Sequence, residues 1–395
     1  MRWILLILMS FQGIVAFQML YSVILYVSVS VRRTWAKFSV TSVPERDYAI
    51  IVTAYKQTEM IPHAVESILS LNYKNYIVYI VADCCDISNL KIDSDKVLIL
   101  RPEETLASNI KSHFYAMNNF VRDHEYLTII DSDNLVDAEY LNELNLAFDS
   151  GFSAVQGIRT AKNLNSHYAC LDEAGDMYYR FVDRKVLFSS GSSASLAGSG
   201  MAFTTRLYRE CLEHVNMHGA GFDKLLQYEI VKRSYRIAFA ENAIVYDEKT
   251  AKTDQLVKQR ARWINTWFRF IKLGIRLQFI SVKNLNVNQF LFSMMLLRPP
   301  LFLLFLAHGL CLILNIVVFG WLSVVFFLVP VIAFMYLFSK SLAHYRASKK
   351  IYSSLMNYPK FFYFQVIALL NSKRANQLSV ATEHEHNSSL NKLNP

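Results

Sequence analysis

Hydrophobic residues follow three different patterns along this chain. Residues 1–31 are almost continuously apolar, residues 48–157 alternate short apolar runs with mixed stretches, and residues 301–338 are again almost continuously apolar. An uncharged run of about 20 residues is long enough to cross a bilayer as a helix. Short apolar runs separated by helical stretches are typical of a parallel sheet covered by helices. The pattern therefore predicts an α/β domain with membrane segments on both sides.

The middle region contains the elements of this predicted domain. Each apolar β-prone run is followed by a stretch with helical periodicity, which is the βαβ signature of a mostly parallel sheet. We expect strands at 48–53, 77–82, 97–100, 127–131 and near 154–157, and helices at 59–71, 107–120, 138–148, 222–230 and 253–274.

Two aspartates one residue apart follow the most apolar of these strands. Asp131 and Asp133 come directly after Leu127-Thr-Ile-Ile, and ligands of parallel sheets bind at the carboxyl ends of the strands. Mg²⁺ is usually held by one or two carboxylates together with the phosphates of a substrate. Asp83 comes directly after the predicted strand 77–82 and is expected at the same edge. The alternative is that Asp131 or Asp133 only caps the helix that begins near Ala138.

Two further segments carry candidate functional groups. The run of small residues 189–200 includes Gly198, Ser199 and Gly200 and would let the backbone approach a ligand closely, although a flexible loop explains it equally well. Asp223 is predicted at the start of a helix. There it would serve as an N-cap or present a carboxylate at a loop edge.

The predicted helix 253–274 contains Gln259, Arg262 and Trp263. Their i, i+3, i+4 spacing places them on one helix face. An arginine can hold phosphate oxygens and an indole can stack on a sugar ring. The alternative is an amphipathic surface helix with a tryptophan in the bilayer interface.

The flanking segments predict a multi-pass protein of the inner or plasma membrane. The first run is too long for a signal peptide and precedes Arg32, Arg33 and Lys37, while Arg298 and a basic cluster from Lys340 flank the second apolar region. Bases beside a span remain on the cytoplasmic side, so the domain is expected in the cytosol. The expected regions are an anchor (1–31), a cytosolic domain (44–250), the Gln259 helix with interfacial helices (251–298), a transmembrane hairpin (299–339), and an interfacial segment with a disordered tail (340–395).

Composition and charge narrow the classes of partner. The formal net charge is +9, but the bases gather beside apolar segments and no nucleic-acid-binding module is recognisable. Anionic lipid headgroups and a phosphate-bearing substrate account for this charge better than nucleic acid does. The five scattered cysteines match neither a zinc site nor a disulfide framework.

Taken in order, these motifs resemble glycosyltransferase family 2, specifically its membrane-embedded branch of cellulose, chitin and hyaluronan synthases. The resemblance covers roughly residues 48–263 and the flanking membrane segments, and it implies a glycosyltransferase-A-type fold that binds a nucleotide sugar. The motifs that carry it are Thr53-Ala-Tyr55, Asp83, Asp131-Ser-Asp133, Gly198-Ser-Gly200, Asp223 and Gln259-Arg-Ala-Arg262-Trp263.

The resemblance implies a role for each matching residue. Ala54, Tyr55, Asp83, Asp131 and Lys111 would bind the UDP-sugar, with Asp83 at the uracil, and Asp133 would hold Mg²⁺ or Mn²⁺. Asp223 would be the general base of an inverting displacement. Gln259, Arg262 and Trp263 would hold the diphosphate and the acceptor. Residues 198–203 would line the acceptor site. Gly221-Phe222 departs from the Thr-Glu pair that is usual before this aspartate.

Three functions follow from these observations. The first is transfer of a hexosyl or N-acetylhexosaminyl group to a growing polysaccharide or glycan. The second is a single addition to a lipid-linked acceptor. Three membrane helices are few for a polysaccharide channel, which favours an oligomer, an export partner or no translocation at all. The third, an inactive membrane scaffold, is disfavoured because the carboxylates Asp131, Asp133 and Asp223 are all present.

Overall fold

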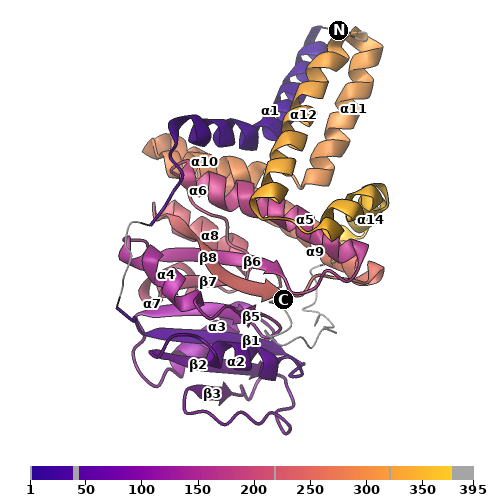
Figure 1. Ribbon diagram of the computed structural model, residues 1–395. Coiled ribbons are helices and arrows are strands. Elements are labelled where there is room, and N and C mark those ends of the chain that lie inside the picture. The colour runs from indigo at the N-terminus through magenta and orange to yellow at the C-terminus, as the bar shows by residue number, and fades with distance from the viewer. Residues whose placement is uncertain (1, 39–43, 218, 320–321, 376–395) are drawn as a thin grey trace.

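The computed structural model describes residues 2–38, 44–217, 219–319 and 322–375. A sheet domain lies at one end of the molecule, three long helices project from the other end, and a layer of further helices lies between them (Figure 1). The predicted connection at Gly320-Trp321 and the predicted tail from Thr382, with His384 and His386, lie outside the described residues.

One sheet contains the eight strands that the described residues form: β1 (Tyr48–Tyr55), β2 (Tyr76–Asp83), β3 (Val97–Leu100), β4 (Tyr126–Asp131), β5 (Leu135–Val136), β6 (Ala154–Ala161), β7 (Met201–Thr204) and β8 (Ile237–Asp247). Their order across the sheet is β3-β2-β1-β4-β7-β6-β8-β5. The strands β1 to β4 pair in parallel, as do β6 and β8, whereas β7 is antiparallel to both of its neighbours. The prediction of an α/β domain with a mostly parallel sheet is confirmed.

Helices pack around the sheet, and all of them except the helix at Thr205–Leu212 lie where the sequence predicts them. Because both faces of a parallel sheet are covered, its strands are apolar throughout, and the side chains of β1, β2 and β4 are almost all buried. The helices of the sheet domain are α2 (Ile61–Leu69), α3 (Asn109–Asn118), α4 (Tyr140–Asp149), α7 (Thr205–Leu212) and α8 (Phe222–Lys232).

The layer between the sheet and the projecting helices was only partly predicted. The predicted helix from Thr253 continues to Asn284 instead of ending at Gly274, and no helix was expected between residues 167 and 189. In that stretch α5 (His167–Arg180) continues through the π-helical turn η1 (Phe181–Val186) into α6 (Leu187–Ser189). The rest of the layer consists of α9 (Thr253–Asn284), α10 (Val287–Leu297), α13 (Lys349–Ser354) and α14 (Tyr358–Leu370).

The three projecting helices are α1 (Arg2–Arg32), α11 (Leu301–Phe319) and α12 (Leu322–His344). Each contains a segment that is long and apolar enough to cross a membrane, namely 6–32, 301–318 and 327–344. The N-terminal part of α1 lies beside α11 and α12 (Figure 1). Outward-facing residues such as Ile14, Val317 and Ile332 are largely exposed. Exposed apolar surface of this kind suits contact with lipid.

Arg298 does not occupy the position that the topology prediction assumed for it. The prediction treated Arg298 as a base at the membrane surface, but its side chain is only 4% exposed and pairs with Asp183 of η1 at 2.5 and 2.7 Å. It also donates to Ser22 of α1 at 2.8 Å. Burying an arginine requires such partners. Arg298 therefore joins the projecting helix α1 to η1 of the helical layer.

Candidate active site

The strand ends that were expected to meet at one edge of the sheet do so. In the parallel register Thr53 is opposite Asp131 and Tyr55 is opposite Asp83. Ala54, only 3% exposed, lies between them in the core. Asp83 and Asp131 are thus carried by the two strands on either side of β1, at the same carboxyl edge.

Both carboxylate oxygens of Asp83 accept hydrogen bonds from the protein backbone. One of its carboxylate oxygens accepts the amide of Leu106 at 2.9 Å, the other accepts the amide of Ala107 at 2.7 Å, and the side chain is buried. The carboxylate thereby fixes the loop that leads into α3. Lys111, the other candidate contributed by this region, is exposed on α3 and does not line the cavity that contains Asp131.

The small-residue run is held firmly against the end of β4. The hydroxyl of Ser199 accepts the amide of Asp131 at 3.1 Å, and the amide of Gly200 donates to Ile129 at 2.9 Å. Gln156 fixes the same loop, since its side-chain nitrogen donates to the carbonyls of Ser199 and Gly200, both at 3.1 Å. The flexible-loop alternative is therefore wrong for residues 198–200. Residues 201–203 form core strand β7 and do not line a site.

Gln156 was not predicted as a site residue, although its position carried a signal. It is a fully buried amide in β6, where it follows the apolar residues Ala154 and Val155. A buried amide has to find hydrogen-bond partners, and here those partners are the backbone atoms of the loop beside Asp131.

Asp133 lies one residue beyond Ser132 in the turn after β4. Its backbone oxygen accepts Lys162 Nζ at 3.2 Å, and its side chain is half-buried. No group of three or more His, Cys, Asp and Glu residues suited to a metal occurs among the described residues. Mg²⁺ or Mn²⁺ sites that use substrate phosphates need only one or two carboxylates. Asp131 and Asp133 fit that donor set.

Asp223 lies in the first turn of α8 and lines the same cavity as Asp131. It is not the N-cap, which is Gly221 with a left-handed φ of +100°. A Cβ at Gly221 would come within 2.6 Å of the Phe270 ring of α9, so glycine lets the start of α8 approach α9 closely. The only ion pair of Asp223 within the described residues is with the adjacent Lys224, at 3.2 Å.

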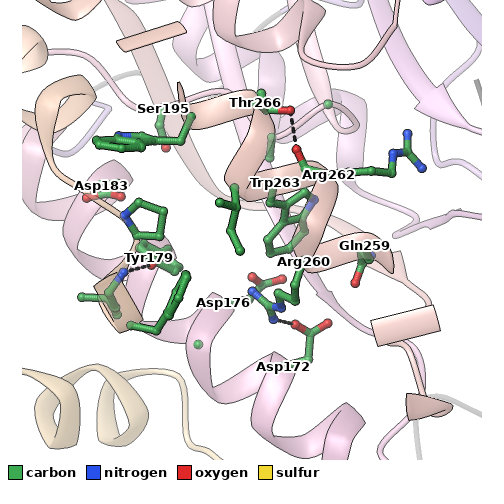
Figure 2. Close-up of a pocket in the computed structure, with 18 of the residues that line it drawn as sticks. Asp172, Asp176, Tyr179, Asp183, Ser195, Gln259, Arg260, Arg262, Trp263 and Thr266 are labelled. Carbon is green, nitrogen blue, oxygen red and sulfur yellow. Dashed lines mark hydrogen bonds and ion pairs between the residues drawn. The ribbon is translucent and has the colours of Figure 1, made fainter. Parts of the chain in front are cut away.

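Gln259, Arg262 and Trp263 of α9 all line the cavity, as their predicted common face implies. Gln259 accepts the hydroxyl of Thr250 at 3.2 Å. Burial lowers the pKa of Arg262. Arg260, which the sequence motif leaves unspecified, pairs with Asp172 and lies 4.4 Å from the Trp263 ring centre. Figure 2 shows Arg260 turned toward Asp172 and Arg262 pointing away from both.

Buried ion pairs between α5 and the end of β8 form the wall beside these residues. Lys249 pairs with Asp176 at 2.5 Å and with Asp247 at 3.2 Å, and Asp247 also pairs with Arg159 at 2.6 Å. Burial raises the pKa of Asp176, but Lys249, Arg159 and Arg180 together more than offset this and the net shift is downward. Each carboxylate in this wall is thus matched by a buried cation.

A cavity of about 1310 Å³ connects some of these groups, but Asp83, Asp133, Ser199 and Gly200 are not among its lining residues. It is lined by Asp131 at the sheet edge, by Asp223 at the start of α8, and by the Gln259, Arg262 and Trp263 face of α9. It also reaches α11 and α12. Polar side chains from the sheet edge and from α9 therefore line the same cavity.

Strand order, register and the position of this cavity define a glycosyltransferase-A-like α/β fold. The family model described as "Glycosyltransferase like family 2" matches residues 44–266, which is more than half of the chain. The protein belongs to this family, and membership indicates a transferase.

Two solved structures are similar to this chain. The mannosyltransferase PcManGT from Pyrobaculum calidifontis, in complex with GDP-Man and Mn²⁺, is similar with a TM-score of 0.59 and 12% identity, over 92% of this chain and 98% of that chain. S. aureus TarS matches with a TM-score of 0.38 and 12% identity, over 63% of this chain and 55% of that chain. At these identities the first likeness concerns the fold alone, and the second carries no argument. No curated protein matches by sequence.

Proposed function

We propose that this protein is an inverting, metal-dependent glycosyltransferase that moves a sugar from a UDP-sugar to a glycan hydroxyl at the cytosolic face of a membrane. The observation that supports this most strongly is that Asp131, Asp223 and the Gln259, Arg262 and Trp263 face share one cavity. The order of these motifs along the chain resembles that of the cellulose, chitin and hyaluronan synthases.

The donor would lie along the carboxyl edge of β1, β2 and β4. Asp131 and Asp133 would hold a Mg²⁺ or Mn²⁺ ion, which supplies positive charge to the diphosphate leaving group. Arg262 would add a second positive charge. The carboxylate of Asp83 binds the amides of the loop that leads into α3. The base would therefore contact this loop, or the loop would move so that the base contacts Asp83 directly. Because the related mannosyltransferase is a complex with GDP-Man and Mn²⁺, GDP-mannose belongs among the donors to be tested.

Asp223 would be the general base. The other carboxylates that line the deep part of the cavity are paired with cations: Asp172 with Arg260, and Asp176 with Lys249. Lys249 helps to hold the pKa of Asp176 below its usual value, and the carboxylate of Asp172, whose pKa burial raises, is occupied by Arg260. Asp223 has only the adjacent, partly exposed Lys224, so it is the carboxylate best able to deprotonate an acceptor hydroxyl.

The reaction would then be a single displacement. The acceptor oxygen attacks the anomeric carbon from the face opposite the diphosphate, and the bond from that carbon to the diphosphate oxygen breaks. The nucleoside diphosphate leaves with the electron pair, while Asp223 takes the proton of the hydroxyl. One displacement inverts the configuration. Asp172 and Asp176, which also line the cavity, are held in ion pairs with Arg260 and Lys249, so neither is available as a nucleophile for a covalent intermediate.

A donor panel with a metal control tests this function. Membranes containing the protein are incubated with UDP-glucose, UDP-N-acetylglucosamine, UDP-galactose or GDP-mannose, and release of the nucleoside diphosphate is measured. We expect release with a UDP-sugar, its loss in excess EDTA and its recovery with Mg²⁺ or Mn²⁺.

Asp133→Ala should lower this release about 10²- to 10³-fold, since a bound metal contributes several kcal/mol of charge stabilisation. Asp254→Ala, at an exposed position of the first turn of α9, is the matched control and should retain activity. Full turnover by Asp133→Ala or in EDTA would contradict the metal assignment, and release with GDP-mannose alone would contradict the UDP assignment.

A further inference from the structure

The cavity continues from the catalytic groups into a wall built by the membrane helices. Beyond Trp263 it is lined by Tyr179 of α5, Phe305 of α11, and Phe334 and Phe338 of α12. Phe305 and Phe334 meet edge to face at 4.9 Å between ring centres. This second half of the cavity therefore lies at the point where the two predicted spans reach the sheet domain.

Polar groups in this half are already engaged with one another. The Tyr179 hydroxyl accepts the amide of Leu301 at 3.3 Å, and Asp183 is held by Arg298. Figure 2 shows Tyr179 and Asp183 on the side of the cavity away from Gln259. A sugar chain needs hydrogen-bond partners for its hydroxyls, and here these groups are occupied. The wall suits an apolar chain better than a glycan.

Gly175 leaves open space on the α5 side of this cavity. It lines the cavity, and a Cβ added there would meet no atom within 4 Å. Its helical neighbours Asp172 and Asp176 hold the ion pairs with Arg260 and Lys249. The ordered wall thus has one gap that a side chain could fill without a steric clash.

A half-buried cation, Arg184, also lines the cavity. Within the described part of the chain Arg184 of η1 forms no ion pair, and its Nε donates to the carbonyl of Ser195 at 3.3 Å. The pKa of Arg184 is lowered to about 10, mainly by burial. Nearby Asp176 acts in the opposite direction, and Arg180 and Arg159 add to the lowering. Arg184 remains charged at neutral pH. A half-buried positive charge next to other cations favours binding of an anion.

We infer that the acceptor is a lipid-linked sugar, in which a phosphate joins an apolar chain to a sugar head that carries the reacting hydroxyl. The lipid chain lies against Phe305, Phe334 and Phe338, the phosphate binds Arg184, and the hydroxyl reaches Asp223. The inference rests on the proposed function and replaces its general glycan acceptor with a membrane-anchored one. The hydroxyl oxygen bonds to the anomeric carbon, the nucleoside diphosphate departs with the electron pair, and Asp223 takes the proton.

Binding tests the inference without requiring turnover. Thermal unfolding of the detergent-solubilised full chain is measured with UDP, a long-chain polyprenyl phosphate, the corresponding polyprenol, and inorganic phosphate. We expect stabilisation by UDP and by polyprenyl phosphate, a smaller effect of polyprenol, and none of inorganic phosphate.

Arg184→Gln should weaken polyprenyl phosphate binding about 10- to 100-fold, as expected for loss of a hydrogen bond to a charged group. Arg206→Gln, an exposed arginine on α7, is the control and should bind as wild type. Equal effects of polyprenol and polyprenyl phosphate in the wild type, or an unchanged affinity in Arg184→Gln, would contradict the phosphate site.

Filling the gap tests the same cavity from another side. Gly175→Leu should retain UDP binding but lose polyprenyl phosphate binding and sugar transfer to lipid. Gly309→Leu, at a position on α11 that also has no atom within 4 Å of an added Cβ and does not line the cavity, should keep both. Lipid binding and transfer that survive in Gly175→Leu would overturn the proposed path.

The fate of labelled sugar separates this inference from the proposed function. Radiolabel from the active donor should be extracted into chloroform and methanol. Label only in alcohol-insoluble polymer would leave the glycosyltransferase function standing and overturn the lipid acceptor. Absence of UDP binding, UDP release and labelled product together would overturn the proposed function itself.

Discussion

Removing Arg298 should lower the free energy of unfolding, because its side chain joins α1 to η1 of the helical layer. Its guanidinium holds Asp183 at 2.5 and 2.7 Å and Ser22 at 2.8 Å, with side chains that are 4% and 11% exposed in the ion pair. Arg298→Met leaves the Asp183 carboxylate buried without its partner. Breaking a buried pair in this way costs about 3 to 5 kcal/mol.

The size of this effect is measurable as a shift in unfolding temperature. A change of 1 kcal/mol moves the midpoint by about 2 to 4 °C in a domain of about 150 to 250 residues, so Arg298→Met should lower it by about 6 to 20 °C. Tryptophan fluorescence during heating in detergent provides the assay. The double variant Asp183→Leu with Arg298→Met should recover most of the loss, because two apolar residues replace the pair without leaving a buried charge.

A surface ion pair supplies the control for this measurement. Arg206 pairs with Glu210 on α7, and the Arg206 side chain is 87% exposed. Arg206→Met should change stability by no more than about 1 kcal/mol. The reasoning is refuted if Arg298→Met shifts the midpoint no further than Arg206→Met. A double variant as unstable as Arg298→Met would show that lost packing, and not the unpaired carboxylate, causes the effect.

Two further predictions concern α8 and the core. Gly221→Ala should reduce sugar transfer more than it reduces UDP binding, because the added Cβ would displace the start of α8 from α9. The control Gly151→Ala, also at positive φ but with no atom within 4 Å of the added Cβ, should leave transfer unchanged. Equal losses of transfer in the two variants would exclude the steric argument. Burial lowers the pKa of His113 to about 3, so the folded state loses stability as the pH falls below about 6.5, by about 2 kcal/mol at pH 5. In urea unfolding, His113→Gln should remove this part of the pH dependence, whereas His214→Asn, at an exposed position, should not. An unchanged pH dependence of stability in His113→Gln would contradict this prediction.

The sheet edge was predictable because its pattern is local. Short apolar strands ending at Asp83 and Asp131 require only that parallel strands place their carboxyl ends together, and the register confirms this. The common face of Gln259, Arg262 and Trp263 followed from helical periodicity in the same way. These features depend on residues close together in the chain.

The deep wall of the cavity was not predictable because its partners are distant in sequence. Lys249 meets Asp176 only after α5 packs against the end of β8, and Arg298 meets Asp183 across 115 residues. Charge pattern alone favoured a surface position for Arg298. A buried charge is tolerated only once its partner is in place, and the sequence does not show which residues will become neighbours.

Asp223→Asn tests the central claim most directly, since the asparagine keeps the size of the side chain and removes its ability to take a proton. We predict that the purified variant transfers sugar about 10²- to 10⁴-fold more slowly in a single turnover than the wild type, with unchanged UDP affinity and unfolding temperature, and that Asp254→Asn behaves as the wild type. Transfer at the wild-type rate by Asp223→Asn would contradict the account by placing the base elsewhere, and loss of UDP binding or of folding would contradict it by making Asp223 a structural residue.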